Sequence, residues 1–160
     1  MNSKIKTLDE LAKIVTRLKD RGLVVVHCHG VFDLLHPGHI RHFEAAKKEG
    51  NVLIVTLTQD EYVNKGPGRP AFNQRLRAES VAALEIVDWV AINKWPSAVK
   101  TILKLKPDVY VKGSDYVKRE EDLTGKIYDE EQAVLDVGGR IHFTNDIAFS
   151  STSLLNSYFK

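Results

Sequence analysis

Hydrophobic residues change their spacing regularly along the chain, and each change predicts a new element. Between residues 8 and 18 they recur on one helical face, after a Thr7–Glu10 pair with capping-box spacing, and Gly22 ends the pattern. Residues 23–26 form a short apolar, largely β-branched run that is typical of a strand buried on both faces. The same reasoning predicts strands at 52–57, 89–92, 109–111 and 141–143, and helices at 40–48, 73–84, 96–105, 129–137 and 151–158.

Strands that alternate with helices indicate an α/β fold with a parallel sheet, because parallel strands need crossover connections. A chain of 160 residues suffices for one domain, residues 1–160, and we find no repeat or linker in it. Ligands of such sheets bind beyond the carboxyl ends of the strands, where Gly30, Thr58 and Gly113 fall. We therefore look for function in the loops at these three residues.

Composition excludes several classes of function. Apolar residues make up 43% and charged residues 28% of the chain, as in ordinary globular proteins. The net charge of +2 is too small for a protein that mainly binds a nucleic-acid backbone, and no apolar run approaches the roughly 18 residues of a membrane span. Cys28 is the only cysteine, and the first nine residues are too polar for a secretory signal. The sequence thus predicts a cytoplasmic protein with neither a nucleic-acid nor a membrane partner.

Histidines are concentrated in one segment, which holds five of the six in the chain: His27, His29, His36, His39 and His42. Pro37 and Gly38 suit the first turn of a helix, whose exposed backbone N–H groups favour an anion. His36 and His39 are three residues apart, so on that turn they project to the same side and can donate to one phosphoryl group. We therefore predict a phosphate site here.

Two other interpretations of these histidines stay open. His27 and His42 fit equally well as packing or surface residues. Imidazoles at these spacings, with Cys28 close by, could also hold zinc. His27 and His29 would share one face of a strand while Cys28 points to the other, so only one side could converge on a metal. A zinc site would also need neither the Pro37–Gly38 turn nor the basic loop at residues 64–70.

The run Gly30-Val31-Phe32-Asp33, followed by His36-Pro37-Gly38-His39, resembles the GxFD…HxGH signature of a nucleotidyltransferase superfamily. That superfamily includes glycerol-3-phosphate cytidylyltransferase and the adenylyltransferase domain of ADP-heptose synthesis. The resemblance continues through Lys65, residues 77–90, 111–116 and 149–152, and so covers about residues 24–158. It implies a Rossmann-like, doubly wound parallel sheet in a single domain.

The resemblance also implies roles for individual residues. His36, His39, Lys65 and Arg77 would be catalytic; Arg77 stands at the family's arginine between loop and helix, and the nearby Arg75 does not. Nucleotide would be bound by three groups of residues: Gly30, Val31, Phe32, Asp33 and Gly38; Lys112, Gly113 and Asp115; and Ser150, Ser151 and Thr152. No residues are implied as direct metal ligands, so the metal site stays unknown.

The loop 64–70 contains two glycines and two prolines around Lys65 and Arg69. On its own it is typical of a solvated surface loop, and it has few side chains that could anchor it, so we expect it to be mobile without ligand. The resemblance makes Lys65 a ligand of the acceptor's phosphate or of the triphosphate.

The implied reaction moves a nucleoside monophosphate from a triphosphate, with Mg²⁺, onto a phosphorylated sugar or polyol and releases pyrophosphate. ATP is favoured because residues 111–116 look like the heptose branch, and because residues 144–148 lack the arginine of glycerol-type cytidylyltransferases. A CTP-dependent enzyme acting on a polyol phosphate, a nucleotide-binding module without turnover and a zinc hydrolase are the alternatives. The resemblance also leaves room for a homodimer and for fusion or pairing with a sugar kinase.

Overall fold

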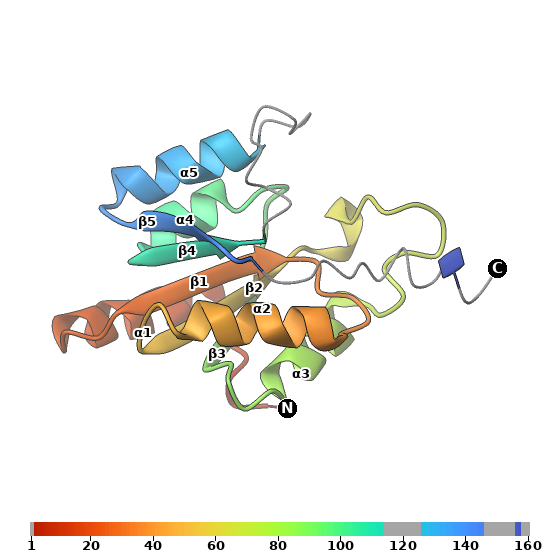
Figure 1. The fold of residues 1–160 in the computed structure, drawn as a ribbon, viewed down its shortest axis with the longest axis horizontal. Coiled ribbons are helices and arrows are strands. Elements are labelled where there is room, and N and C mark those ends of the chain that lie inside the picture. Colours follow the sequence, from red (N-terminus) through yellow and green to blue (C-terminus); the bar gives the residue numbers. More distant parts are fainter. Residues whose placement is uncertain (1, 114–125, 146–155, 158–160) are drawn as a thin grey trace.

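A five-stranded parallel sheet lies at the centre of the fold, with the strand order β3-β2-β1-β4-β5 (Figure 1). The computed structural model describes residues 2–113, 126–145 and 156–157. The strands are β1 (Val25–Gly30), β2 (Val52–Leu57), β3 (Trp89–Ile92), β4 (Val109–Lys112) and β5 (Arg140–Phe143). Four of them follow the predicted ranges within one residue.

β1 is the exception, because it begins two residues later and ends four residues later than the predicted 23–26. The histidines are part of the strand: His27, Cys28 and His29 are buried and pair with residues 54–56 of β2. Histidine is a weak strand signal on its own, so the end of the apolar run gave the wrong boundary. Gly30 is therefore the last residue of β1.

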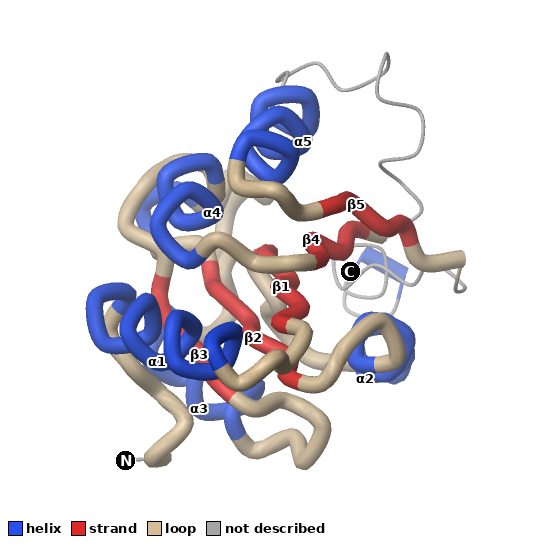
Figure 2. Tube along the Cα trace, turned by 90° about the vertical axis from the view of Figure 1, so that its left-hand side faces the viewer, coloured by secondary structure: helices blue, strands red, loops and turns tan. Residues whose placement is uncertain are grey.

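Helices cover both faces of the sheet (Figures 1 and 2). On one face, α2 (Pro37–Lys47) and α3 (Gln74–Ala82) pack on a core that includes Val26, Cys28 and Val55. On the other face lie α1 (Leu8–Asp20), α4 (Val99–Leu105) and α5 (Lys126–Asp136), which contact Ile54 or Tyr110. This confirms the doubly wound, Rossmann-like arrangement. In the described part of the chain, no helix combines the length and the apolar character that crossing a bilayer requires.

Helix boundaries show which local signals were decisive. The capping box of Thr7 and Glu10 is present at the start of α1. α2 begins at Pro37, three residues before the predicted start, because His36 acts as its N-cap. α4 begins at Val99 instead of the predicted 96, α3 spans only Gln74–Ala82, and α5 begins three residues early, at Lys126. The predicted last helix, 151–158, lies almost entirely outside the described residues.

The strand order reverses direction between β1 and β4, because the chain winds from β1 to β3 and then returns to the far side of β1. Such a switch point leaves a crevice at the carboxyl ends of the strands. The predicted loops meet there: the Thr58 N–H donates to the Gly30 carbonyl at 3.0 Å, and Lys112 Nζ donates to the His29 carbonyl at 3.0 Å.

Candidate functional site

The start of α2 lies beside this crevice and is capped by its own histidines. His36 Nδ1 accepts from the Gly38 N–H at 3.1 Å, and His39 Nδ1 accepts from the His36 N–H at 3.3 Å. The two imidazole rings stack with centroids 3.9 Å apart. Because each Nδ1 is an acceptor, each neutral ring carries its hydrogen on Nε2. The helix start thus fixes two N–H donors side by side.

Both rings are neutral at pH 7. Burial lowers the pKa of His36. It lowers the pKa of His39 to about 4, with further contributions from the charges of His36, His42 and Lys65. A bound anion would offset these effects, because negative charge favours the protonated imidazole. The pair can therefore donate hydrogen bonds without protonation.

Phe32 supports this pair from the loop after β1. Its ring contacts Phe43 at a centroid distance of 4.8 Å and the edge of His39 at 5.7 Å. The backbone of Phe32 has a positive φ of 49°. A Cβ on Gly30 would lie only 3.0 Å from the Phe32 ring, so glycine is needed there for the ring to pack as it does.

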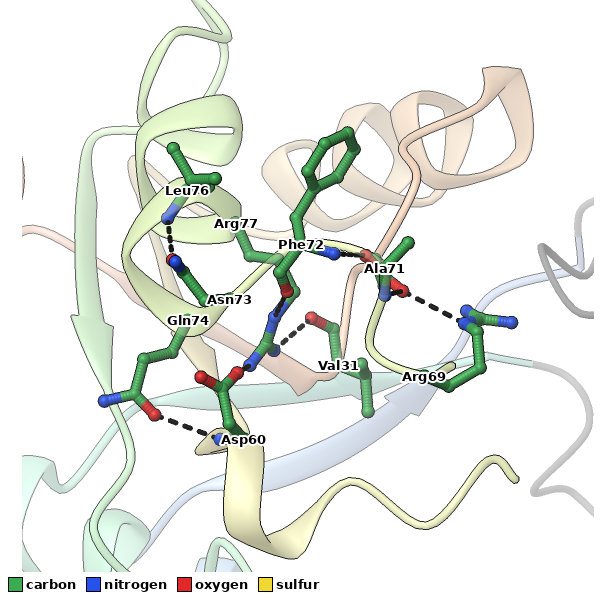
Figure 3. A network of polar contacts seen from close by, with 10 residues as sticks. Val31, Asp60, Arg69, Ala71, Phe72, Asn73, Gln74, Leu76 and Arg77 are labelled. Carbon is green, nitrogen blue, oxygen red and sulfur yellow. Dashed lines mark hydrogen bonds and ion pairs between the residues drawn. The ribbon is translucent and has the colours of Figure 1, made fainter. Parts of the chain in front are cut away.

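Asp33 anchors the loop that we expected to lack anchors. Its carboxylate accepts from Arg69 Nε at 3.0 Å and from the N–H groups of Ala71 at 2.6 Å and Phe72 at 3.1 Å (Figure 3). Burial opposes its ionisation, but these three donors outweigh burial and lower its pKa. The Asp33 and Arg69 side chains are 0% and 6% exposed. The expectation that this loop has few anchoring side chains therefore misses a buried ion pair.

Arg77 is buried within a network of protein groups (Figure 3). Its Nε donates to the Phe72 carbonyl at 3.0 Å, Nη1 donates to the Val31 carbonyl at 2.9 Å, and Nη2 contacts Asp60 at 2.7 Å. The Asp60 N–H in turn donates to the side chain of Gln74. All three guanidinium nitrogens are used within the protein. We therefore expect Arg77 to position the surrounding loops, and the catalytic role that the resemblance implies for it stays a prediction.

Lys65 is exposed on the loop between β2 and α3. Desolvation by neighbouring protein atoms and the charge of Arg69 lower the pKa of its amino group, while Asp33 raises it. Its charge also contributes to the low pKa of His39. Lys65 thus lies within electrostatic reach of both the histidine pair and the Asp33–Arg69 ion pair.

β4 ends at Lys112 on the other side of the crevice, and Gly113 follows it. Lys112 is buried and holds the end of β1 through the His29 carbonyl, while a Cβ at Gly113 would have open space around it. The four remaining predicted nucleotide ligands, Asp115, Ser150, Ser151 and Thr152, lie outside the described residues.

Sequence reasoning missed Thr56. Its hydroxyl lies 2.7 Å from His27 Nε2 and 2.9 Å from His29 Nδ1, which confirms that both histidines share one face of β1. His42, from α2, contacts the hydroxyl of Thr144 at 3.0 Å. A threonine within a predicted buried strand, opposite histidines of the neighbouring strand, is the signal that could have indicated such a pair.

The zinc interpretation finds no support in this geometry. Burial raises the pKa of the Cys28 thiol to about 12, and a zinc ligand must be a thiolate. Cys28 faces the core formed with α2 and α3, away from the two strand histidines. Among the residues that the structure describes, no three His, Cys, Asp or Glu side chains are grouped to hold a metal ion.

A doubly wound sheet with paired donors at a helix start beside the switch point defines an α/β protein of the nucleotide-binding class. Comparison with known proteins specifies the family. The chain belongs to the cytidylyltransferase-like family, whose sequence model matches residues 27–155.

Relatives and solved structures agree with this assignment. The chain is 38% identical over 154 residues to the bifunctional protein HldE of Geobacter metallireducens and 41% identical over 142 residues to that of Aliarcobacter butzleri. These matches cover 95% and 87% of this chain but 30% and 29% of the relatives, so the chain spans about a third of their length. A lipopolysaccharide core biosynthesis protein from Thermoplasma volcanium superposes with a TM-score of 0.63 at 26% identity, over 81% of this chain and 100% of the other. The pantoate-beta-alanine ligase from Francisella tularensis shares the fold, with a TM-score of 0.64 at 18% identity, over 95% of this chain and 72% of the other.

Proposed function

We propose that this chain is an adenylyltransferase that transfers AMP from ATP to a sugar 1-phosphate or a similar phosphorylated polyol and releases pyrophosphate. The observation that carries the proposal is the His36–His39 pair, which presents two Nε2–H donors at the start of α2. ATP and a sugar phosphate are favoured by the similarity to HldE and by the resemblance to the adenylyltransferase domain of ADP-heptose synthesis.

In this reaction an oxygen of the acceptor phosphate attacks the α-phosphorus of ATP in line. The bond from that phosphorus to the bridging oxygen breaks, and its electron pair leaves with pyrophosphate. A phosphate monoester is mostly ionised at neutral pH, so the acceptor needs no general base. The Nε2–H groups of His36 and His39 would stabilise the negative charge that builds up on the phosphoryl oxygens. Gly38 lets the triphosphate approach the backbone closely.

Lys65 would bind the phosphate of the acceptor. Its loop is fixed at one end by the Asp33–Arg69 ion pair, while Lys65 itself stays exposed. Burial and the charge of Arg69 lower the pKa of its amino group, and a bound phosphate would raise that pKa again. We expect Lys65→Ala to reduce kcat/KM for the acceptor about 10-fold or more while ATP affinity changes less. A larger loss of ATP affinity than of kcat/KM for the acceptor would assign Lys65 to the triphosphate instead.

Mg²⁺ would arrive with the triphosphate. The carboxylate next to the site, Asp33, is already taken up by three hydrogen bonds, so the described residues fit a metal held mainly by phosphate oxygens. Mg²⁺ bound there would neutralise charge on the phosphates and so favour the departure of pyrophosphate. This role does not require a set of acidic side chains that binds the metal directly.

The test is to incubate the protein with each nucleoside triphosphate and a panel of sugar 1-phosphates and polyol phosphates, and to measure pyrophosphate. ATP with a sugar 1-phosphate should give the highest rate. His142, on β5 beside Glu49, offers a matched control: His142→Ala should retain activity that His39→Ala loses. A CTP-specific rate would favour the cytidylyltransferase alternative. Tight ATP binding without pyrophosphate from any pair would favour a binding module and contradict the proposal.

A further inference from the structure

His27 and His29 have no part in the proposed phosphate chemistry, yet both have defined hydrogen-bond partners inside the fold. Both are buried on β1, and both contact the hydroxyl of Thr56 on β2. His29 and Thr56 are direct partners in the parallel register of the two strands. The side chains therefore form a continuous polar line, His27–Thr56–His29, that runs toward the carboxyl ends of the strands.

The direction of the hydrogen bonds along this line follows from one atom. His27 Nδ1 is buried and makes no hydrogen bond within the described part of the chain. A buried N–H without an acceptor is rarer in proteins than an acceptor without a donor, so the hydrogen of His27 belongs on Nε2. His27 then donates to Thr56, and the Thr56 hydroxyl donates its single hydrogen to His29 Nδ1. It follows that His29 carries its own hydrogen on Nε2.

Among the residues that the structure describes, the Nε2–H of His29 has only a long contact, at the edge of the sheet. The Thr58 hydroxyl lies 3.5 Å from Nε2, beyond the usual distance of about 2.7–3.2 Å for such a hydrogen bond. His29 and Thr58 are each 8% exposed, so both lie just inside the surface of the crevice. Both positions are fixed by backbone contacts, since Thr58 N–H donates to Gly30 and Lys112 Nζ donates to the His29 carbonyl.

We propose that His29 Nε2–H and the Thr58 hydroxyl form a subsite that binds one hydroxyl group of the sugar or polyol acceptor. A hydroxyl group can accept from His29 and donate to Thr58 at the same time, which a phosphate oxygen cannot do. The subsite rests on the proposed function, because it needs an acceptor that carries hydroxyl groups as well as phosphate.

Charge and position favour the acceptor over the nucleotide. Burial, and next the charge of Lys112, keep the pKa of His29 well below its ordinary value, so the ring is a neutral donor suited to a neutral group. Thr58 follows β2, and the chain continues from it toward Lys65. The loop at Gly113 follows β4, on the opposite side of β1. The subsite therefore lies on the side of the crevice that leads to the proposed acceptor-phosphate ligand.

Steady-state kinetics of the full chain test this assignment. His29→Leu and Thr58→Val should each raise KM for the acceptor at least about 5-fold, and KM for ATP should stay within about 2-fold. His29→Gln, which can place an amide N–H near the position of Nε2, should lie closer to the wild type. Thr16→Val, an exposed threonine of α1, is the matched control for Thr58→Val. A rise confined to KM for ATP would overturn the proposal.

Monodeoxy analogues of the best acceptor give the sharper measurement. With the wild type, one analogue should have a kcat/KM about 10-fold or more below that of the complete acceptor. With His29→Leu, that analogue and the complete acceptor should have similar kcat/KM values. Wild-type turnover with an unchanged pattern of penalties in His29→Leu would overturn the subsite alone. Failure of the wild type to release pyrophosphate with any acceptor would overturn the proposed function and the subsite with it.

The hydrogen-bond direction can be measured without turnover. ¹⁵N NMR of the histidine side chains in the free protein should show His29 as the Nε2–H tautomer, and Thr56→Val should remove this preference. Addition of the acceptor should then shift the His29 Nε2 signal, and inorganic phosphate should not. The Nδ1–H tautomer, or equal shifts with inorganic phosphate, would contradict the proposal.

Discussion

Two regions of the site keep their polar groups in place in different ways. The rim, which we define as His36, His39, Asp33 and Arg69, satisfies its side chains mainly with backbone N–H groups of nearby turns. The floor, which we define as His27, Thr56 and His29, satisfies its side chains with one another across two strands. Backbone donors fix a ring at a point that the local turn defines. In a line of hydrogen-bonded side chains, the donor or acceptor role of each group instead determines the role of the next group.

This difference indicates whether changes in each region should affect kcat, the free energy of unfolding or binding of the acceptor. The two histidines of the rim present donors that can meet phosphate charge, so changes there should act on kcat, whereas the buried Asp33–Arg69 ion pair of the rim should act on stability. Groups on the floor are buried and neutral, so changes there should act on the free energy of unfolding and on the acceptor. The following predictions separate these two outcomes.

The largest effect is expected at the rim. His36→Ala and His39→Ala should each lower kcat at least ~100-fold, because their donors act on charge that develops in the transition state. The dissociation constant for ATP, measured by calorimetry, should change much less. Near-normal kcat in either variant would remove that histidine from the mechanism.

The buried ion pair at the rim should matter for stability. Arg69→Met leaves the Asp33 carboxylate buried with only its backbone donors, so the free energy of unfolding should fall by about 3 kcal/mol. Denaturation in urea measures this change. Arg75→Met is the matched control: Arg75 pairs with Glu79 on the exposed surface of α3, and its loss should cost less than about 0.5 kcal/mol. Equal costs for the two variants would mean that the ion pair does not anchor the loop.

On the floor, Thr56→Val should leave two buried imidazole nitrogens without their shared partner. The expected loss in the free energy of unfolding is about 2 kcal/mol, because valine fills the same space and only the hydrogen bonds disappear. Thr16→Val again serves as the exposed control, measured in the same urea series. If Thr56→Val is as stable as the wild type, the two histidines do not depend on that hydroxyl.

The smallest effect concerns pH. Burial, and next the charge of Lys112, lower the pKa of His27 from 6.5 to about 3, so the unfolded chain binds a proton there that the folded protein does not. Stability therefore falls as pH drops below 6.5 and stops falling, for this group, near pH 3. Between pH 6 and 5, His27→Phe should lose about 1 kcal/mol less per pH unit than the wild type. Identical slopes would show that His27 titrates normally.

Local patterns along the chain determine the parts of this fold that are predictable from the sequence. The alternation of elements predicted the parallel sheet, the resemblance implied its doubly wound arrangement, and the spacing of His36 and His39 around Pro37 predicted a shared helix turn. The Asp33–Arg69 ion pair joins residues 36 positions apart, and no local pattern indicates it. The same holds for Arg77, whose partners come from three separate segments, and for Thr56, whose role depends on the register of β1 and β2. Such contacts exist only once the sheet has assembled.

His36 has two tasks in one ring, because its Nδ1 caps α2 while its Nε2 faces the chemistry that we propose. Serine, aspartate and asparagine are the usual residues at such a position, since their short side chains reach the helix N–H groups readily. A directed-evolution screen that selects only for thermal resistance should therefore recover these residues at position 36. The resulting variants, such as His36→Ser, would have a more stable α2 and little activity. The start of α2 is thus a place where stability and activity compete for a single side chain.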